Sequence, residues 1–362
     1  MSNKIAFLGD THFGARGDNQ ILRDSIIDYF DNQFFPYLIE NNIKIVIQLG
    51  DLFDKRKSTN HETLYLTRKH FLERFDELGI QLLVLIGNHD IYYRESNQIS
   101  CVQEFLRGYN NITPIIGNEQ FKQGETTFDL IPWINDENYD DTMDFIDKSS
   151  SDYCIGHFEF AGFKFSKDGI VAEKGLSRKL FSKYKHVYSG HYHTRSSQGN
   201  ITYTGTPYEL TWADYDDPKG FMVFNLDTGD VEFIENTFTL HNRLVYDDSD
   251  NDYKDLKLES FSHLKNCIVE VHVNAKKTKK YFDKFMKFIY DVNPATVEVV
   301  DNTQKIKYDV SNNDSTVSHM DTQQRLDSGI EIVHQSNVMI NKDKLSRLGK
   351  EIYDEAECMG RL

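Results

Sequence analysis

The chain has 362 residues, of which 39% are hydrophobic and 27% are charged. This length exceeds what one compact core usually holds, so we expect one large domain with one or two smaller appendages. No apolar run approaches the roughly 20 residues that span a bilayer, which argues against a membrane protein. A net charge of −16 argues against a chain that binds nucleic acid alone through a basic face, although bound cations or a partner could supply positive charge.

The amino-terminal residues and the cysteines both favour an intracellular setting. Met1 is followed almost at once by the apolar residues 5–8, which leaves no room for a signal peptide. The four cysteines are scattered and show no CxxC spacing, which is typical of reduced thiols. We therefore expect a cytoplasmic protein.

One short pattern recurs between residue 4 and about residue 210. Each time, an apolar strand is followed by glycine and then by residues of the types that bind metals. The five units are Gly9-Asp10-Thr11-His12, Gly50-Asp51, Gly87-Asn88-His89-Asp90, Gly156-His157 and Gly190-His191-Tyr192-His193. Glycine allows a tight turn at the strand end and keeps a side chain out of the space beside it.

Segments of helical character separate the early strands. They lie at about 19–40 and 61–78, and in the second one Leu64, Phe71 and Phe75 recur near helical spacing. Strands that alternate with helices indicate an α/β domain. Sites in such domains form where the carboxyl ends of the strands open into loops, so we expect the polar side chains of the five units to meet there.

Beyond residue 207 the pattern changes. Two strand-like stretches at 221–225 and 231–235 are joined by Asp227-Thr228-Gly229, which predicts a hairpin that closes the main domain. The acidic stretch 247–255 is interpreted as a linker.

The rest of the chain is predicted to hold a small module and a tail. Residues 268–273, 276–290 and 296–300 favour a strand, a helix and a strand, and the polar stretch 311–324 favours a linker. The predicted division is a main domain at 1–240, a small module at 256–308, a linker at 309–340 and a helical segment at 341–362.

Seven side chains from the five units could hold two divalent metal ions. A metal pair that activates water and neutralises a phosphate needs a bridging carboxylate together with imidazole and oxygen ligands. This mixture favours manganese, iron or zinc over an all-oxygen magnesium site. Each unit alone is weak, because Gly-Asp after a strand is usually a turn, but five in one order are hard to obtain by chance. The seven are Asp10, His12, Asp51, Asn88, His157, His191 and His193.

In this order, the motifs resemble the five motifs of calcineurin-like metallophosphoesterases. They are Asp10-x-His12, Gly50-Asp51-x-x-Asp54, Gly87-Asn88-His89-Asp90, Gly156-His157 and Gly190-His191-x-His193. Within that superfamily the chain is similar to the nuclease subunit of the meiotic-recombination (SbcD-type) nuclease family, in the version carried by T-even-like phages. The closer likeness also includes Asp129-Leu130-Ile131-Pro132-Trp133 and Tyr203-Thr204-Gly205-Thr206-Pro207, and it extends more loosely to the carboxyl terminus.

The resemblance implies a role for each candidate site residue. One metal would be held by Asp10, His12, Asp51 and His193, and the second by Asp51, Asn88, His157 and His191. Manganese is expected, with magnesium, iron and zinc as alternatives. His89 resembles the histidine that donates to the scissile phosphate or the leaving oxygen, and Asp54 or Asp90 would orient its ring. Some family members carry histidine where this chain has Asp54.

The resemblance also implies a fold and an activity. The fold would be an α/β sandwich, two mixed sheets flanked by helices, with a small α+β capping module and a carboxyl-terminal helical segment. The activity would be that of a metal-dependent DNA nuclease, a 3′-to-5′ exonuclease and single-strand endonuclease in DNA recombination, repair and replication. A homodimer is also expected from the family, through helices between residues 61 and 106.

Two other functions remain open on the sequence. One is a phosphatase or small-molecule phosphodiesterase with the same metal core, although Lys55-Arg56-Lys57 follows Asp54 where protein Ser/Thr phosphatases carry Arg-Gly. The other is a non-catalytic scaffold for an ATPase partner, against which the intact ligand set argues.

Charged and apolar clusters supply the candidate binding surfaces. Lys55, Arg56 and Lys57 could contact the DNA backbone, and a solvated loop is an equal alternative. A second basic group could hold duplex DNA, although such a cluster is more often a solvent-exposed charged turn. This group consists of Lys276, Lys277, Lys279 and Lys280. In the resembling family the tail binds an SMC-like ATPase, and here its apolar stripe is Leu345, Leu348 and Ile352. Trp133, which follows an apolar strand, is predicted to lie in the core.

Overall fold

A computed structural model describes residues 3–164, 167, 169–250 and 253–303 of the chain. The predicted linker at 309–340 and the helical segment at 341–362 lie outside the described residues. The same holds for the proposed partner-binding side chains Leu345, Leu348 and Ile352.

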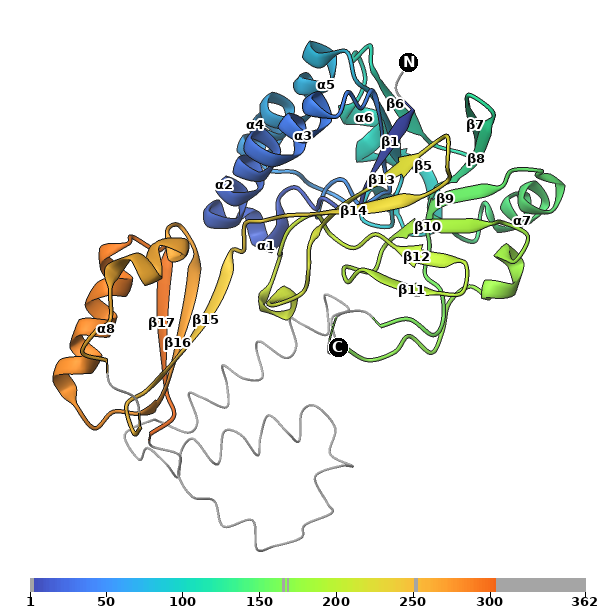
Figure 1. Ribbon diagram of the computed structural model, residues 1–362. Coiled ribbons are helices and arrows are strands. Elements are labelled where there is room, and N and C mark those ends of the chain that lie inside the picture. Colours follow the sequence, from blue (N-terminus) through green and yellow to red (C-terminus); the bar gives the residue numbers. More distant parts are fainter. Residues whose placement is uncertain (1–2, 165–166, 168, 251–252, 304–362) are drawn as a thin grey trace, which may run out of the picture. The chain divides into compact units, whose positions relative to one another are not determined.

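Two six-stranded mixed sheets form the main domain (Figure 1). The first has the order β14-β13-β1-β2-β3-β6, and its strands are β1 (Lys4–Leu8), β2 (Ile45–Gln48), β3 (Gln81–Leu85), β6 (Ile112–Ile115), β13 (Gly220–Asn225) and β14 (Val231–Glu235). The second has the order β11-β12-β10-β9-β8-β7, and its strands are β7 (Glu119–Gln123), β8 (Thr126–Ile131), β9 (Tyr153–His157), β10 (His186–Gly190), β11 (Ser196–Gln198) and β12 (Ile201–Tyr203). In the first sheet β1, β2, β3 and β6 are parallel to one another, β13 pairs antiparallel with β1, and β14 pairs antiparallel with β13. In the second sheet the four central strands are parallel, and the edge strands β7 and β11 pair antiparallel with their neighbours.

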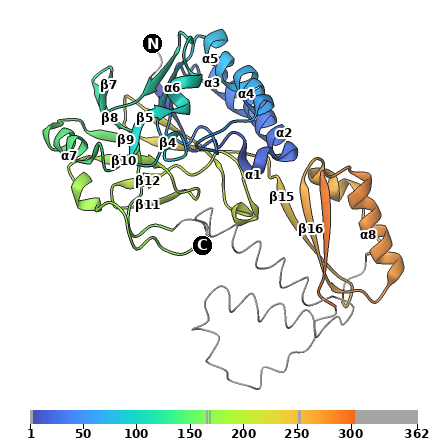
Figure 2. The ribbon, with the colours of Figure 1, turned by 180° about the vertical axis from the view of Figure 1, so that it is seen from behind.

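Helices cover the outer face of each sheet (Figures 1 and 2). The two helical segments predicted at 19–40 and 61–78 are confirmed, and each contains a π-helical turn. The first comprises α2 (Gln20–Tyr29), η1 (Phe30–Phe34) and α3 (Phe35–Glu40), after the short α1 (Ala15–Asp18); the second comprises α4 (His61–Thr67), η2 (Arg68–Leu72) and α5 (Glu73–Leu78). The second sheet is covered by α7 (Tyr139–Lys148) and η3 (Arg178–Phe181), while α6 (Cys101–Phe105) packs on the first.

The core explains why the strands look uniformly apolar in the sequence. In β1, Ile5 and Phe7 belong to the cluster between the two sheets, whereas Ala6 and Leu8 pack against the helices. A strand that is buried on both faces requires apolar residues at every position. The predicted α/β sandwich of two mixed sheets is therefore confirmed, and so is the hairpin of β13 and β14.

The small module contains one strand more than the sequence predicted. Its sheet has the order β15-β16-β17, all parallel, with the elements β15 (His241–Asp247), η5 (Leu258–Leu264), β16 (Ile268–Ala275), α8 (Lys279–Asp291) and β17 (Thr296–Asp301). Strand β15 alternates between buried and exposed residues, so it shows no continuous apolar run. The module therefore begins at residue 241, before the predicted start at 256, and the acidic stretch 247–255 lies inside it.

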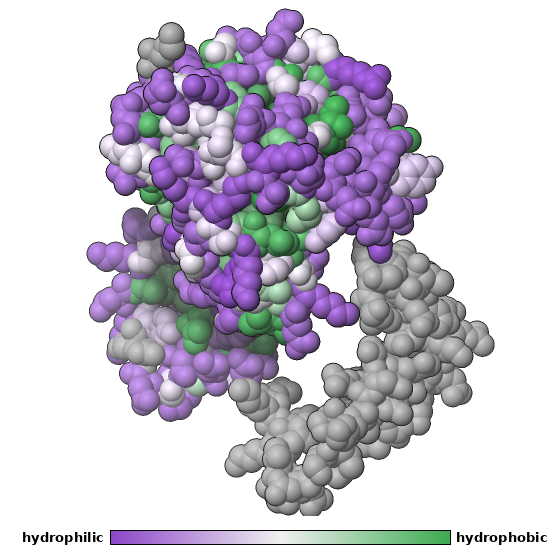
Figure 3. All heavy atoms as spheres, turned by 90° about the vertical axis from the view of Figure 1, so that its right-hand side faces the viewer, coloured by the Kyte–Doolittle hydropathy of each residue, from purple (hydrophilic) through white to green (hydrophobic). Residues whose placement is uncertain are grey.

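The surface is mainly hydrophilic on the face that Figure 3 shows, with separate hydrophobic patches. Over the described part of the chain, no helix combines the length and the apolar character that crossing a membrane requires. Three cysteines in this part are free, Cys101, Cys154 and Cys267, as expected from their scattered positions.

Candidate metal centre

The five glycine-containing loops meet where parallel strands of the two sheets end. They follow β1, β2 and β3 of the first sheet and close β9 and β10 of the second. The structure brings together the donor atoms of all seven predicted metal ligands, in two adjoining groups.

The first group consists of Asp10, His12 and His193, whose donor atoms all lie within 4.8 Å of one another. The Nε2 atoms of His12 and His193 are 3.0 Å apart. Asp10 Oδ2 lies 4.0 Å from His12 Nε2 and 3.9 Å from His193 Nε2. Two imidazole nitrogens and one carboxylate oxygen thus face a single point.

The second group consists of Asp51, His157 and His191, joined by Asn88. Asn88 Oδ1 lies 3.0 Å from His157 Nε2 and 2.8 Å from His191 Nδ1. An amide oxygen, a carboxylate and two imidazoles again converge, which is a donor set that suits a divalent transition metal.

Asp51 lies between the two groups. Its Oδ2 is 3.7 Å from His12 Nε2 in the first group and 3.4 Å from His157 Nε2 in the second. Its Oδ1 accepts a hydrogen bond of 2.7 Å from the backbone N–H of His89. One carboxylate oxygen therefore faces both groups, as a bridging ligand must.

Contacts behind the imidazoles orient the donor nitrogens. His157 Nδ1 donates to the carbonyl oxygen of Leu49 at 2.7 Å, so Nε2 is the nitrogen that remains for a metal. His12 Nδ1 is buried without a hydrogen-bond partner and lies 3.5 Å from Asp54 Oδ1. Metal-binding histidines commonly direct the second nitrogen to a carbonyl or a carboxylate in this way.

The backbone is strained at three of the predicted ligands. His12, Asp51 and His191 have φ values of +44°, +54° and +98°, which residues other than glycine adopt in only a few per cent of cases. Such conformations cost about 1–3 kcal/mol each and cluster at functional sites. The strain indicates that the loops are shaped to direct these side chains.

Two glycines leave room for the ligands. A Cβ atom on Gly87 would lie 2.3 Å from Asp51 Oδ1, and one on Gly190 would lie 2.5 Å from Asp10 Oδ1. Because carbon and oxygen cannot approach so closely, any other residue at either position would displace a ligand. This confirms that glycine keeps side chains out of the site.

The negative charges of Asp10 and Asp51 repel each other, and the neighbouring imidazoles partly offset this repulsion. Burial, together with the charge of Asp51, raises the pKa of Asp10 to about 6, although His157 and His12 act to lower it. Burial also acts to raise the pKa of Asp51, yet His157, His89 and His12 hold it well below its usual value. Burial and neighbouring His157 lower the pKa of His191 to about 3. Buried acidic oxygens beside a neutral imidazole are a favourable environment for divalent cations, so the residues present fit the predicted metals.

His89 lies beside the first group. Its ring centroid is 5.0 Å from that of His12, and with His12 and Asp54 it forms a third set of donor atoms that could hold an ion. Its Nδ1 lies 2.6 Å from the backbone carbonyl oxygen of Asp54. Donation to that carbonyl leaves Nε2 as the nitrogen that can act on a substrate.

The structure corrects the predicted supports of His89. The ring is held by the backbone carbonyl of Asp54, whereas the Asp54 carboxylate faces His12. Asp90 is fully buried and accepts hydrogen bonds from the backbone N–H groups of Leu52, Phe53 and Gly87. Its carboxylate is therefore engaged in joining the loops after β2 and β3 and does not orient the His89 ring.

The basic residues after Asp54 are largely engaged within the protein. Arg56 Nε donates to the carbonyl oxygen of Asn88 at 2.7 Å, so it supports a predicted ligand directly. Lys55 forms an ion pair of 3.3 Å with Asp18, and the Lys57 amine lies 5.2 Å from the centre of the Tyr92 ring.

The predicted basic group of the small module is only partly engaged. Lys276 lies over the Phe282 ring, with its amine 3.7 Å from the ring centre. Lys277 donates to the carbonyl oxygen of Ser249 at 3.1 Å. Lys279 and Lys280 are exposed in the first turn of α8.

Two supports of the site were missed in the sequence. Trp133, predicted to be core, is only partly buried, and its ring centre lies 5.4 Å from that of His191 and 5.9 Å from that of His157. Lys219 donates to the carbonyl oxygen of His193 at 2.8 Å. Position directly after an apolar strand was the only sequence signal for Trp133, and no local pattern distinguishes Lys219.

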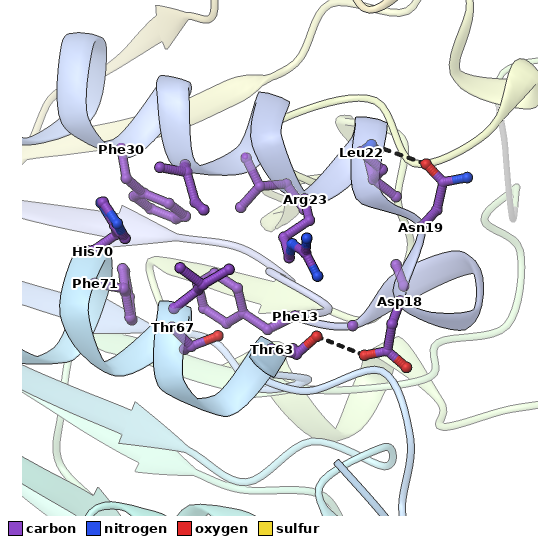
Figure 4. A pocket seen from close by; sticks show the side chains of 15 residues that line it. Phe13, Asp18, Asn19, Leu22, Arg23, Phe30, Thr63, Thr67, His70 and Phe71 are labelled. Atoms are coloured by element: carbon purple, nitrogen blue, oxygen red, sulfur yellow. Dashed lines mark hydrogen bonds between the residues drawn. The ribbon is translucent and has the colours of Figure 1, made fainter. Parts of the chain in front are cut away.

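A cavity lies between α2 and α4 (Figure 4). Phe13, Leu22, Phe30 and Phe71 contribute apolar side chains to it, and Thr63 donates a hydrogen bond of 2.6 Å to Asp18 at its edge. None of the seven predicted ligands lines this cavity.

The fold and the donor groups define the class of protein. Residues 3–195 match the family described as calcineurin-like phosphoesterase, so the chain belongs to this family of metal-dependent hydrolases.

Comparison with individual proteins narrows the relationship. The chain is 34% identical over 301 residues to exonuclease subunit 1 of Enterobacteria phage T4, covering 83% of this chain and 85% of that protein. It is 31% identical over 87 residues to the DNA double-strand break repair protein Mre11 of Sulfurisphaera tokodaii, which covers 24% of this chain and 22% of the relative. The Mre11 protein of Nanoarchaeum equitans is 20% identical over 245 residues, 61% of this chain and 66% of its own length. The predicted resemblance to the recombination nucleases is thereby confirmed.

Proposed function

We propose that this chain is a metal-dependent DNA nuclease that hydrolyses phosphodiester bonds as a 3′-to-5′ exonuclease and single-strand endonuclease. The observation that carries the proposal is the convergence of two donor groups on Asp51, whose Oδ2 faces an imidazole of each group at 3.7 and 3.4 Å. The likeness to a phage exonuclease subunit over most of both chains supports DNA as the substrate.

Each donor group would hold one divalent cation. Asp10, His12 and His193 would hold the first, and Asn88, His157 and His191 the second, with Asp51 shared between them. Four of these seven side chains are imidazoles, which favours manganese, iron or zinc over magnesium, and we propose manganese. When bound, such a pair neutralises the phosphate charge and activates water at neutral pH.

His89 would act on the departing oxygen. Its Nδ1 is held by the Asp54 carbonyl and its backbone N–H by Asp51, so the ring is fixed while Nε2 remains available. A positioned imidazole can donate a proton to the 3′ oxygen as negative charge develops there. In this assignment the backbone carbonyl of Asp54 positions the His89 ring, and the Asp90 carboxylate positions the loops after β2 and β3.

The chain would work as part of a complex. We propose that residues 341–362, with Leu345, Leu348 and Ile352, bind an SMC-like ATPase, and that the protein forms a homodimer. We also propose that Lys279 and Lys280 of the small module contact the DNA backbone. Positive charge from the metals and the partner would offset the net charge of −16, because affinity for DNA depends on neutralising phosphates.

A comparison of three substrates tests this function. With manganese, the protein is expected to degrade a DNA oligonucleotide and to hydrolyse a phosphodiester reporter faster than the matching phosphomonoester. Faster hydrolysis of the monoester with no cleavage of DNA would instead support a phosphatase. Absence of hydrolysis of all three substrates by the metal-loaded protein would support the scaffold function.

A further inference from the structure

A two-stranded hairpin projects next to the predicted catalytic histidine. It consists of β4 (Ile91–Tyr93) and β5 (Ser96–Ser100), which pair only with each other (Figure 2). Strand β4 starts two residues after His89, so the hairpin continues the loop that carries Asn88 and His89.

The hairpin exposes two aromatic rings. Tyr92 is 38% exposed and Tyr93 is 55% exposed. Their ring centroids are 4.8 Å apart, with the planes at 72° to each other. Two tyrosines at adjacent positions of a strand normally contact a core on at least one side, whereas here both remain accessible. Large accessible aromatic surfaces beside an active site are suited to stacking on a ligand.

Cationic side chains lie near these rings, although Glu95 is in the turn of the same hairpin and the chain as a whole is acidic. The Lys57 amine lies 5.2 Å from the centre of the Tyr92 ring. Arg56 precedes Lys57 in the same loop, and Arg94 lies in the hairpin turn directly after Tyr93.

The base of the hairpin is firmly attached to the metal centre. The backbone N–H of Cys101 donates to the carbonyl oxygen of Asp90 at 2.9 Å. Asn97 donates to the carbonyl oxygen of Trp133 at 2.9 Å, and the Trp133 ring contacts His191. The aromatic rings are therefore presented by a rigid support, which reduces the entropy lost on binding.

We propose that Tyr92 and Tyr93 form a stacking platform for unpaired bases of the DNA substrate, with Arg56, Lys57 and Arg94 binding the adjoining phosphates. This inference rests on the proposed nuclease function and adds to it the residues that select single-stranded over blunt duplex DNA. Aromatic side chains interleaved with cations bind single strands without regard to sequence, because every base offers a flat face. A paired base in a blunt duplex has both faces occupied by its neighbours and gains nothing from the platform.

The test compares Tyr92→Ala and Tyr93→Ala with Tyr92→Phe and Tyr93→Phe in the full-length, manganese-loaded protein. Cleavage of a single-stranded oligonucleotide is measured relative to hydrolysis of a phosphodiester reporter that carries no base. We expect this ratio to fall about 5- to 100-fold in each alanine variant and to be retained in the phenylalanine variants, which keep the ring. Cleavage of a blunt duplex of the same sequence should change by less than about twofold.

Tyr290→Ala provides the matched control, because Tyr290 is 58% exposed and lies near the end of α8 opposite to Lys279 and Lys280. The quenching of 2-aminopurine in the oligonucleotide on binding reports stacking independently of cleavage, and it should weaken only in the hairpin alanine variants. Unchanged quenching, or an equal loss on single-stranded and duplex DNA, would overturn the platform. A wild-type protein that hydrolyses the reporter but no DNA would instead contradict the proposed nuclease function.

Discussion

At the scale of single residues, the positions of nitrogen and oxygen atoms separate ligands from catalytic groups. Asp51 and His89 are joined by a hydrogen bond of 2.7 Å, yet their surroundings differ. The Asp51 carboxylate faces imidazoles of both donor groups, whereas the His89 ring is anchored by a backbone carbonyl. Substitution of Asp51 is therefore expected to weaken metal binding, whereas substitution of His89 is expected to lower turnover.

Replacing His89 with alanine should abolish turnover and leave the metals bound. Loss of a positioned proton donor typically costs about 10²- to 10⁴-fold in rate. Calorimetric titration with manganese should still show two ions, while phosphodiester hydrolysis falls by that factor. Loss of one ion would show that His89 is a ligand, as its place beside His12 and Asp54 also allows.

Replacing Asp51 with asparagine should weaken both metals at once. The change removes the negative charge that screens the two cations from each other and keeps the size of the side chain. Asn88→Ala is the comparison, since Asn88 contacts only the second group and should affect one ion. Titrations in which Asp51→Asn alters a single binding event would contradict the bridging role.

At the scale of elements, the loops after the strands depend on close packing between residues distant in the sequence. Gly190→Ala should disturb the metal centre although no ligand is removed, because the added Cβ would lie 2.5 Å from Asp10 Oδ1 and 2.6 Å from the Leu49 carbonyl oxygen. Overpacking of this kind costs about 1–3 kcal/mol of stability. Manganese titration and urea unfolding should both detect the change. Gly117→Ala is the control, since a Cβ there meets no atom within 4 Å, and an equal effect of both changes would refute the steric argument.

The loop before β13 contains a buried ion pair between Asp214 and Lys219. This pair should make the stability of the protein depend on pH. Lys219 lies 2.7 Å from Asp214, which is 3% exposed and caps the backbone N–H of Leu210. Burial acts to raise the pKa of Asp214, but Lys219 and the N–H of Leu210 hold it below its ordinary value of 3.8. A carboxyl whose pKa is lower in the folded than in the unfolded protein stabilises the fold at any pH above its unfolded-state pKa. This stabilisation is lost as the pH falls through the folded-state pKa.

Asp214→Asn should therefore lower the free energy of unfolding by about 1–3 kcal/mol at pH 7. The difference from the wild type should shrink as the pH falls below about 4, where the carboxyl of the unfolded chain becomes protonated, and it should be lost below the lowered pKa of the folded carboxyl. Urea unfolding at a series of pH values measures this difference. A difference that stays constant down to pH 2 would show that the charge of Asp214 contributes nothing.

At the scale of the whole molecule, residues 1–303 form one compact unit. Every predicted metal ligand lies in this unit. The polar stretch at 311–324 and the apolar stripe of the tail both fall after it. Catalysis and binding of the ATPase partner should therefore be separable.

Removing all residues after Val310 should leave metal binding and hydrolysis of the phosphodiester reporter intact and abolish assembly with the ATPase partner. Co-purification of the truncated and full-length chains with that partner measures assembly. A truncated chain that still co-purifies would place the interface in the compact unit. A truncated chain that loses its metals would show that the tail contributes to the fold.

The sequence by itself determined the class of fold and identified the candidate ligands of the proposed metal centre. Each predicted ligand lies at the end of an apolar strand or within a few residues after it, and the carboxyl ends of parallel strands necessarily meet at one edge of a sheet. Local spacing therefore carries enough information to assemble Asp10, Asp51 and Asn88 from the first sheet with His157 and His191 from the second.

Only the tertiary structure decided which atoms meet across those loops. The hydrogen bonds of Asp90 with Leu52 and of Arg56 with Asn88 join residues more than 30 positions apart in the chain, and the contact of Lys219 with His193 depends on how β13 aligns with the loop after β10. Strand β15 was missed because a strand buried on one face carries a weaker pattern than one buried on both. Hydrogen-bond partners depend on register and side-chain direction in three dimensions, and neither is encoded in the spacing of a single segment.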